Sequence, residues 1–224
     1  MTDTDDFTLD ELRPRLVEAM LPHVPFDGWT ERAVAAAAAD LGVDADVARL
    51  AFSGRPAAMV EAWIGLANRQ MLEALDTDDY RALKVREKVT QAIRTRLEQA
   101  TPHREAVRKA AHVLAVPVNA PVAARTTWAT ASAIWRAAGD TATDLNHYSK
   151  RALAGSVYAA TLLVWLDDDS DGFERTWAFL DRRIAGVMRF EKWKAQLGRL
   201  GGDPETRPSL VRFLGRLRYP ANQG

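Results

Sequence analysis

The sequence feature that constrains the fold most is a run of fifteen residues, 152–166, that contains no charged side chain. Its apolar side chains would face every side of a helix, and such a helix must be buried in a protein core or in a bilayer. As a helix the run would be about 22 Å long, shorter than the roughly 30 Å hydrocarbon layer of a membrane. It also ends in Asp167, Asp168 and Asp169. We therefore expect the central helix of a helical bundle, with a charged segment, residues 139–151, at its entrance.

Composition and charge exclude several classes of protein. The chain of 224 residues has no cysteine, which excludes a disulfide framework, a thiolate zinc site and a cysteine nucleophile. The formal net charge is zero, which argues against general nucleic-acid binding. However, the first residues are acidic and residues 182–218 are basic, so we expect one end of the molecule to meet a charged partner or surface. The acidic opening, MTDTDD, resembles neither a secretory nor a transit peptide and predicts a cytoplasmic protein.

Helical periodicity, caps and breakers predict an all-α chain, because no strand-like alternation extends beyond a few residues. Thr8 and Thr30 are predicted N-caps, and Pro56 a first helical residue. Asp171 and Glu174 are predicted to form a capping box for the last long helix. We expect a helix-turn-helix-like part over residues 1–76, a helical bundle over 79–197 and an amphipathic arm over 205–220. The helices are expected at residues 9–21, 31–41, 44–52, 57–75, 80–98, 102–116, 123–138 and 152–166, and after residue 174.

The N-terminal part has the spacing of a helix-turn-helix: a helix, a turn with Gly42, a short helix from Asp44 and then a long helix. A DNA-reading helix needs basic or amide side chains together with several phosphate contacts. Here the N-terminal turn of the short helix carries Asp44 and Asp46, which would repel phosphates. We therefore interpret the motif as a degenerate scaffold and expect no nucleic acid as a partner.

Signals for catalytic or metal chemistry are weak. The run DDDSDG at residues 167–172 matches the start of a calcium loop, but the twelfth position, which needs a bidentate Glu, is Ala178. The other interpretation of this run is the end of one helix and the cap of the next. The sequence has no Glu-x-x-His pair of a di-iron bundle, no nucleophile elbow, no Walker loop and no dinucleotide fingerprint. We expect no metal, no cofactor and no enzymatic activity.

Seven tryptophans are many for an all-α chain. One explanation is ordinary core packing. The other is a large apolar cavity around the central helix, which would take up isoprene or acyl units, because each buried CH₂ contributes roughly 0.8 kcal/mol. The residues predicted to line this cavity are Trp128, Trp135, Leu153, Val157, Leu162, Trp165 and Phe179.

The C-terminal segment, residues 205–220, combines apolar and basic side chains beyond a glycine-containing break at residues 198–204. An amphipathic segment of this kind binds an anionic leaflet, where each Arg contributes about 1 kcal/mol and inserted Phe and Leu add apolar burial. Alternatively, this arm folds back onto the bundle or pairs with a second copy in a homodimer. The residues predicted to bind the membrane are Leu210, Arg212, Phe213, Leu214, Arg216 and Leu217.

Three stretches resemble the coenzyme-Q-nine family, accessory proteins of ubiquinone biosynthesis. They are HVPFDGW at residues 23–29 with the Ala-rich helix and LGV after it, SAIWRAAGDTATDLNHYSKRALAGSVYAATLLVWLDD at 132–168, and FERTWAFLDRRIAGVMRFEKWK at 173–194. The similarity covers about residues 9–195. It implies a helical bundle similar to TetR-type regulators but without DNA binding, a lipid-binding cavity and an amphipathic membrane helix.

The resemblance also implies a partner, the di-iron hydroxylase that acts on demethoxyubiquinone precursors. The family's docking surface falls here on Leu145, Asn146, His147, Tyr148 and Arg151, with His147 where the family commonly has Trp. The implied function is a non-catalytic protein, peripheral on the inner face of the bacterial plasma membrane. It would bind a polyprenyl quinone intermediate or a phospholipid and present the quinone to the hydroxylase. The alternative is a TetR-like transcriptional regulator with an apolar effector pocket.

Overall fold

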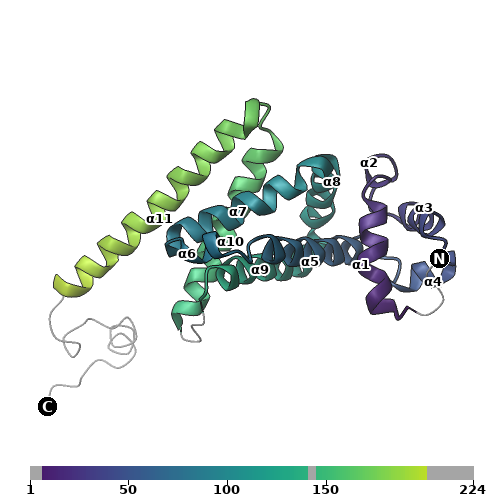
Figure 1. The fold of residues 1–224 in the computed structure, drawn as a ribbon, viewed down its shortest axis with the longest axis horizontal. Helices are drawn as coiled ribbons and strands as arrows, with labels where there is room; N and C mark the ends of the chain where they lie inside the picture. The colour runs from purple at the N-terminus through teal and green to yellow at the C-terminus, as the bar shows by residue number, and fades with distance from the viewer. Residues whose placement is uncertain (1–6, 141–144, 201–224) are drawn as a thin grey trace, which may run out of the picture. The chain divides into compact units, whose positions relative to one another are not determined.

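Every secondary-structure element in the described part of the chain is a helix in the computed structural model, which describes residues 7–140 and 145–200. The predicted all-α class is therefore confirmed (Figure 1). The α-helices are α1 Leu9–Met20, α2 Val24–Asp27, α3 Glu31–Leu41, α4 Ala45–Leu50, α5 Pro56–Ala74, α6 Asp78–Ala82, α7 Val85–Ala100, α8 Arg104–Ala115, α9 Ala120–Ala137, α10 Leu145–Leu166 and α11 Glu174–Leu200. Short 3₁₀ turns occupy Thr101–His103, Pro117–Asn119 and Asp171–Phe173.

The chain divides into two compact units, residues 1–184 and residues 185–224. The predicted boundary between residues 76 and 79 falls inside the first unit, and the predicted bundle, residues 79–197, extends from the first unit into the second. The predicted arm at residues 205–220 lies outside the described residues. None of the described helices is long and apolar enough to cross a membrane.

Local capping defines the N-terminal helices. The predicted cap of α1 is confirmed as a capping box: the Thr8 hydroxyl accepts a hydrogen bond from the Glu11 N–H, and the Glu11 carboxylate accepts one from the Thr8 N–H. Thr30 precedes α3 as predicted, but its hydroxyl donates to Asp27 O instead of capping α3. Helix α3 ends at Gly42, whose left-handed backbone (φ 66°) favours glycine.

The short helix α4 keeps the acidic N-terminus that the sequence indicates. The Asp44 carboxylate accepts hydrogen bonds from the N–H groups of Asp46 (2.8 Å) and Val47 (3.1 Å). Arg49, the basic residue of α4, forms an ion pair with Asp46. Helix α1 packs against α3 and α5, and Figure 1 shows α1 to α4 gathered near one end of α5.

One helix boundary differs clearly from the prediction. Residues 80–98, expected as a single helix, form the end of α6 and most of α7, with Leu83 and Lys84 extended between them. Each helix has its own N-terminal cap: Thr77 at the start of α6 accepts a hydrogen bond from the Tyr80 N–H, and at the start of α7, after the break, the Glu87 carboxylate accepts one from the Lys84 N–H. The apolar periodicity continues across the break, which is why the sequence pattern reads as one helix.

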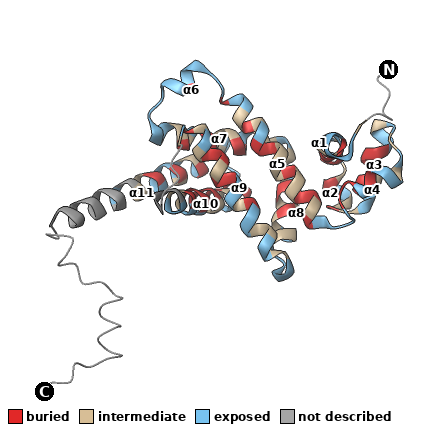
Figure 2. Ribbon diagram, turned by 90° about the horizontal axis from the view of Figure 1, so that it is seen from below, coloured by how far each residue is buried: buried red, intermediate tan, exposed pale blue. Residues whose placement is uncertain are grey.

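Helix α10 packs against α9, and the two backbones approach closely at Gly155, where a Cβ would lie 3.2 Å from Thr127 Cγ2. Val157 and Trp165 are buried, but the prediction of burial on all sides is wrong for Leu163, which is 61% exposed. Helices α7, α8 and α9, which contact α10, do not cover this side chain. Figure 2 shows buried residues in red along α5, α9 and α10, whereas α6 is largely exposed.

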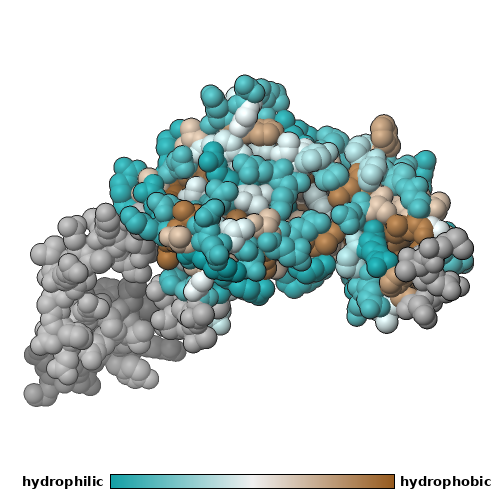
Figure 3. All heavy atoms as spheres, viewed as in Figure 1, coloured by the Kyte–Doolittle hydropathy of each residue, from teal (hydrophilic) through white to brown (hydrophobic). Residues whose placement is uncertain are grey.

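The core of the first unit consists of large side chains that are almost fully buried. They include Trp29, Met59, Ile93, Ile134 and Trp165. On the face of the molecule drawn in Figure 3, hydrophobic residues form small separate patches among hydrophilic ones. The apolar side chains of this unit are thus used mainly for packing between helices.

Asp168 organises the turn between α10 and α11, in place of the predicted capping box. Its carboxylate is 1% exposed and accepts hydrogen bonds of 2.5–3.0 Å from the N–H and hydroxyl groups of Ser170 and Thr176. Burial alone would raise the pKa of Asp168, but these hydrogen bonds outweigh burial and hold the pKa well below its usual value. The box of Asp171 and Glu174 is wrong because Asp171 begins a 3₁₀ turn.

Candidate functional site

An apolar cavity of about 90 Å³ lies inside the bundle. It is bordered by α5, α7, α8, α9 and α10, so residues far apart in the sequence meet around it. Its apolar wall includes Ile64, Leu97, Val107, Leu114, Tyr158 and Leu162. The interior therefore has space for part of an apolar ligand beside the helix that the sequence predicts to be central.

A buried polar network borders this cavity and joins three helices. Arg96 on α7 donates through Nε to Asn68 Oδ1 on α5 (3.4 Å), and Asn68 Nδ2 donates to Thr130 Oγ1 on α9 (3.2 Å). The Thr130 hydroxyl in turn donates to Thr126 O (3.0 Å). The exposed fractions of these four residues run from 1% to 7%. No sequence pattern singles out Arg96, because α7 carries many charged side chains and only packing decides which one is buried.

The residues predicted to bind lipid do not wall a single cavity. Of the seven, Leu162 lines the apolar cavity. Trp128 is 38% exposed and lies beside a separate hollow between α9 and α10. Trp135 donates through Nε1 to Lys150 O (2.9 Å) and so joins the end of α9 to the start of α10.

The other four predicted residues lie on α10 and α11. Trp165 is fully buried, with its ring centroid 5.9 Å from that of Phe173. Val157 is buried, Leu153 is half-buried, and the Phe179 ring lies 4.9 Å from the Arg183 guanidinium. Side chains of α10 point to several sides of the helix, so they contact different neighbours and cannot meet in one space.

The predicted docking residues lie at the start of α10. Tyr148 is 60% exposed and stacks on Trp128, with ring centroids 5.9 Å apart. Arg151, in contrast, is 7% exposed and lies 3.5 Å from the Asp140 carboxylate, so its prediction as an exposed docking residue is wrong. The same carboxylate accepts a hydrogen bond of 2.9 Å from Lys150 Nζ. The side chains of Leu145, Asn146 and His147 lie outside the described residues.

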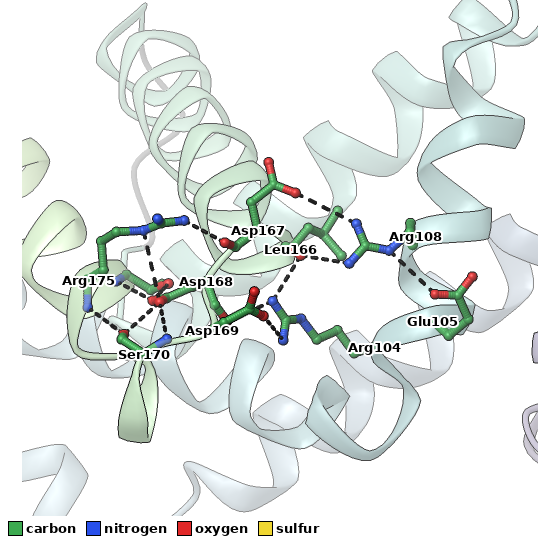
Figure 4. Close-up of polar contacts among 10 residues, drawn as sticks. Arg104, Glu105, Arg108, Leu166, Asp167, Asp168, Asp169, Ser170 and Arg175 are labelled. Carbon is green, nitrogen blue, oxygen red and sulfur yellow. Dashed lines mark hydrogen bonds and ion pairs between the residues drawn. The ribbon is translucent and has the colours of Figure 1, made fainter.

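The acidic run after α10 holds this helix to α8, as Figure 4 shows. Arg104 Nη2 donates to the main-chain oxygens of Leu166 (2.9 Å) and Asp168 (2.7 Å), and Arg108 Nη2 donates to Leu166 O (2.8 Å). Both arginines also form ion pairs with neighbouring aspartates of the run. They satisfy carbonyl groups that the helix end leaves free. Within the described residues, no group of His, Asp and Glu could hold a metal ion.

Comparison with known proteins decides the family. The COQ9 family matches residues 120–191, which include α9 and α10. Ubiquinone biosynthesis protein COQ9-B, mitochondrial, of Xenopus laevis is 30% identical over 207 residues, which cover 89% of this chain and 70% of the relative. This chain belongs to the COQ9 family. The mitochondrial COQ9 proteins of Rattus norvegicus and Homo sapiens are each 29% identical over 194 residues, 83% of this chain, and the chain spans 62% and 61% of their lengths.

The fold is shared with a solved structure. A TetR transcriptional regulator from Nitrosomonas europaea superposes with a TM-score of 0.61 at 21% sequence identity. The superposition covers 78% of this chain and 96% of the regulator. The TetR-like fold expected for this COQ9 protein is therefore confirmed, and at this identity the likeness concerns the fold alone.

Proposed function

We propose that this COQ9 protein is a non-catalytic accessory protein of ubiquinone biosynthesis that binds a polyprenyl quinone intermediate, or a phospholipid, inside its bundle. The family supports the pathway, because the curated relatives are named ubiquinone biosynthesis proteins. The observation that carries the binding proposal is the apolar cavity between α5, α7, α8, α9 and α10. Apolar concave sites of this kind are where small hydrophobic ligands bind.

The size of the cavity limits how a ligand enters. Its volume of about 90 Å³ is smaller than the ~150 Å³ apolar cavity that binds benzene. A prenyl chain therefore enters only as the surrounding helices move apart. Helix α8 contributes Val107 and Leu114 to the wall and α10 contributes Tyr158 and Leu162, so a small separation of these two helices enlarges the cavity. Each CH₂ then buried contributes roughly 0.8 kcal/mol, which offsets part of the ordering cost of binding.

Mass spectrometry of an organic extract of the purified protein tests this proposal. We expect an isoprenoid quinone or a phospholipid in the wild-type extract and several-fold less of it in the Leu162→Trp variant, because the larger side chain fills the cavity. Leu163→Trp is the matched control, since Leu163 is the next residue on α10 but is 61% exposed, and its extract should equal that of the wild type. A wild-type extract free of both lipid classes contradicts the proposal.

The proposal includes presentation of the quinone to a di-iron hydroxylase through the start of α10. The exposed, stacked pair Trp128 and Tyr148 supports this surface, because aromatic side chains often supply most of the energy at protein interfaces. Leu145, Asn146 and His147, which precede Tyr148, remain part of the proposed surface. Alternatively, the C-terminal arm joins two copies of the chain in a homodimer.

The proposal also places the protein on the inner face of the bacterial plasma membrane, held there by residues 205–220. A variant that ends at Gly202 is expected to lose flotation with vesicles containing about 30% anionic lipid, because it lacks the arginines and apolar residues of the arm. Its circular dichroism and thermal midpoint should match those of the full chain. If the shortened chain floats with the vesicles as much as the full chain does, the arm does not have this role.

The alternative of a DNA-binding regulator finds no support in α4. Its N-terminal turn carries Asp44 and Asp46, and its Arg49 is paired with Asp46 rather than free for a phosphate. Specific DNA binders neutralise several phosphates with basic side chains. The likeness to a TetR regulator therefore supports a shared scaffold and not a shared partner.

A further inference from the structure

Arg96 is a buried cation with little compensation from the protein. Its side chain is 3% exposed, and Nε makes one long hydrogen bond, 3.4 Å, to Asn68 Oδ1. The guanidinium carbon lies 6.0 Å from the centroid of the Trp63 ring. Within the described residues, no ion pair joins Arg96 to a carboxylate. A buried charge is costly unless it is paired and hydrogen-bonded, so an acceptor from outside the protein would stabilise it.

Arg96 stands between two cavities. With Trp63 and Ala100 it lines both the apolar cavity of about 90 Å³ and a second cavity of about 340 Å³. The volume of the second cavity is in the range of small-molecule sites. Its lining is more polar, with Glu18, Gln70, Gln99 and His103. A polar space and an apolar space that share one wall fit a ligand with a polar head and an apolar tail.

The second cavity offers both donors and acceptors, and its charges balance. Gln99 Nε2 donates to Gln70 O (3.3 Å), while Gln99 Oε1 is buried without a hydrogen-bond partner in the described part of the chain. Burial lowers the pKa of His103, and the nearby Glu18 carboxylate acts in the opposite direction. Glu18 and Arg96 carry opposite charges. A neutral head with both acceptor and donor oxygens therefore fits this cavity better than a phosphate, which Glu18 would repel.

We propose that the second cavity binds the oxygen-substituted ring of a prenylated quinone or quinol, with Arg96 donating to a ring oxygen and the tail directed into the apolar cavity. This assignment rests on the proposed function and adds the orientation of the ligand. Arg96 is a strong choice for this contact, because its planar guanidinium donates several hydrogen bonds in a fixed geometry. The unpartnered Gln99 Oε1 supplies an acceptor for a ring hydroxyl.

Binding measurements with three probes test the assignment on the delipidated full chain. The probes are a dimethoxy-methyl-benzoquinone with two isoprene units, a ring-free hydrocarbon of the same tail length, and a short-chain phosphatidylglycerol. We expect Arg96→Met to weaken binding of the prenylated quinone about tenfold or more, because a hydrogen bond to a charged donor is lost. Binding of the hydrocarbon should stay the same. Arg86→Met is the matched control, since Arg86 is an exposed arginine of the same helix, and it should bind all probes like the wild type.

The stability of the empty protein separates a binding role from a structural one. If Arg96 serves the ligand, Arg96→Met should leave the thermal midpoint of the empty protein unchanged or raise it, because an incompletely compensated buried charge is removed. If that variant does not fold, Arg96→Lys carries the test, since it keeps the charge but loses the planar donor arrangement; we again expect about tenfold weaker quinone binding.

Each contrary result has one meaning. Wild-type affinity of the Arg96 variants for the prenylated quinone overturns the ring assignment and leaves the proposed function standing. An equal loss for the quinone and the ring-free hydrocarbon also overturns it, because Arg96 then shapes the cavity in general. If the Arg96 variants lose more affinity for phosphatidylglycerol than for the quinone, Arg96 contacts a phosphate, and the ring assignment is overturned. A wild-type chain that binds none of the probes contradicts the proposed function itself.

Discussion

Replacing Trp29 by alanine is expected to lower the free energy of unfolding by about 3–5 kcal/mol, a large part of the stability of a typical domain. The Trp29 side chain is 2% exposed, and its ring centroid lies 5.2 Å from that of Trp63. Its Nε1 donates to Ala106 O on α8 at 3.1 Å. The substitution thus leaves a cavity where the segment before α3 meets α5 and α8, and it removes the hydrogen bond that Trp29 donates to Ala106 O.

Urea unfolding followed by circular dichroism measures this effect. Phe26→Ala is the matched control, because Phe26 lies three residues earlier in the same motif but is 88% exposed. Its free energy of unfolding should change by no more than about 0.5 kcal/mol. Trp29→Phe should fall between the two, since it keeps most of the apolar volume and loses the hydrogen bond. Equal values for Trp29→Ala and Phe26→Ala would show that Trp29 does not join these helices.

Asp168→Ala is expected to lower the free energy of unfolding by about 3 kcal/mol at neutral pH. The variant removes the carboxylate that accepts four hydrogen bonds. The N–H groups of Ser170 and Thr176 then lose their acceptor. Thr176 is itself fully buried, so water cannot replace the lost acceptor for it. Asp169→Ala is the control: its side chain is 93% exposed and its ion pair with Arg104 is 3.5 Å long, so a change below about 1 kcal/mol is expected.

The contribution of Asp168 should depend on pH in one direction. Its pKa in the folded protein is lowered by hydrogen bonds that outweigh the opposing effect of burial. Its stabilising contribution is therefore complete above the ordinary pKa of an aspartate, about 3.9, and is lost as the pH falls toward the folded value. The difference in unfolding free energy between wild type and Asp168→Ala should be constant from pH 7 to pH 5 and shrink below pH 4. A difference that grows as the pH falls would contradict this assignment.

Most of the helices follow from local sequence. Thr8, Asp44 and Pro56 mark helix starts, and Gly42 marks an end, because caps and breakers act within a few residues. The break at Leu83 and Lys84 was not predictable from apolar spacing, since the hydrophobic stripe runs through it. The turn at Asp168 was missed for a related reason. The Asp168 carboxylate accepts hydrogen bonds from the N–H and hydroxyl of Thr176, eight residues later, and this separation is not the three-residue spacing of a capping box.

The site was much less predictable than the helices. An apolar helix indicates an interior but not which of its sides borders an empty space, so of the predicted lipid-binding residues Leu162 alone lines the apolar cavity. Arg151 reads as a surface residue in the sequence, but it is buried beside Asp140, which lies eleven residues earlier. Arg96 could not be distinguished from Arg86 and Arg94 of the same helix, because only packing decides which of the three is buried.

The sequence by itself determined the all-α class, the acidic α4 that is poorly suited to DNA, and the family, because these depend on local residue types and on long motifs that survive at low identity. Only the tertiary structure decided the position of the cavities, the inward orientation of Arg151 and the burial of Arg96 between an apolar and a polar space. These features depend on side chains from different helices that meet in space. Their separation along the chain hides them from any local pattern.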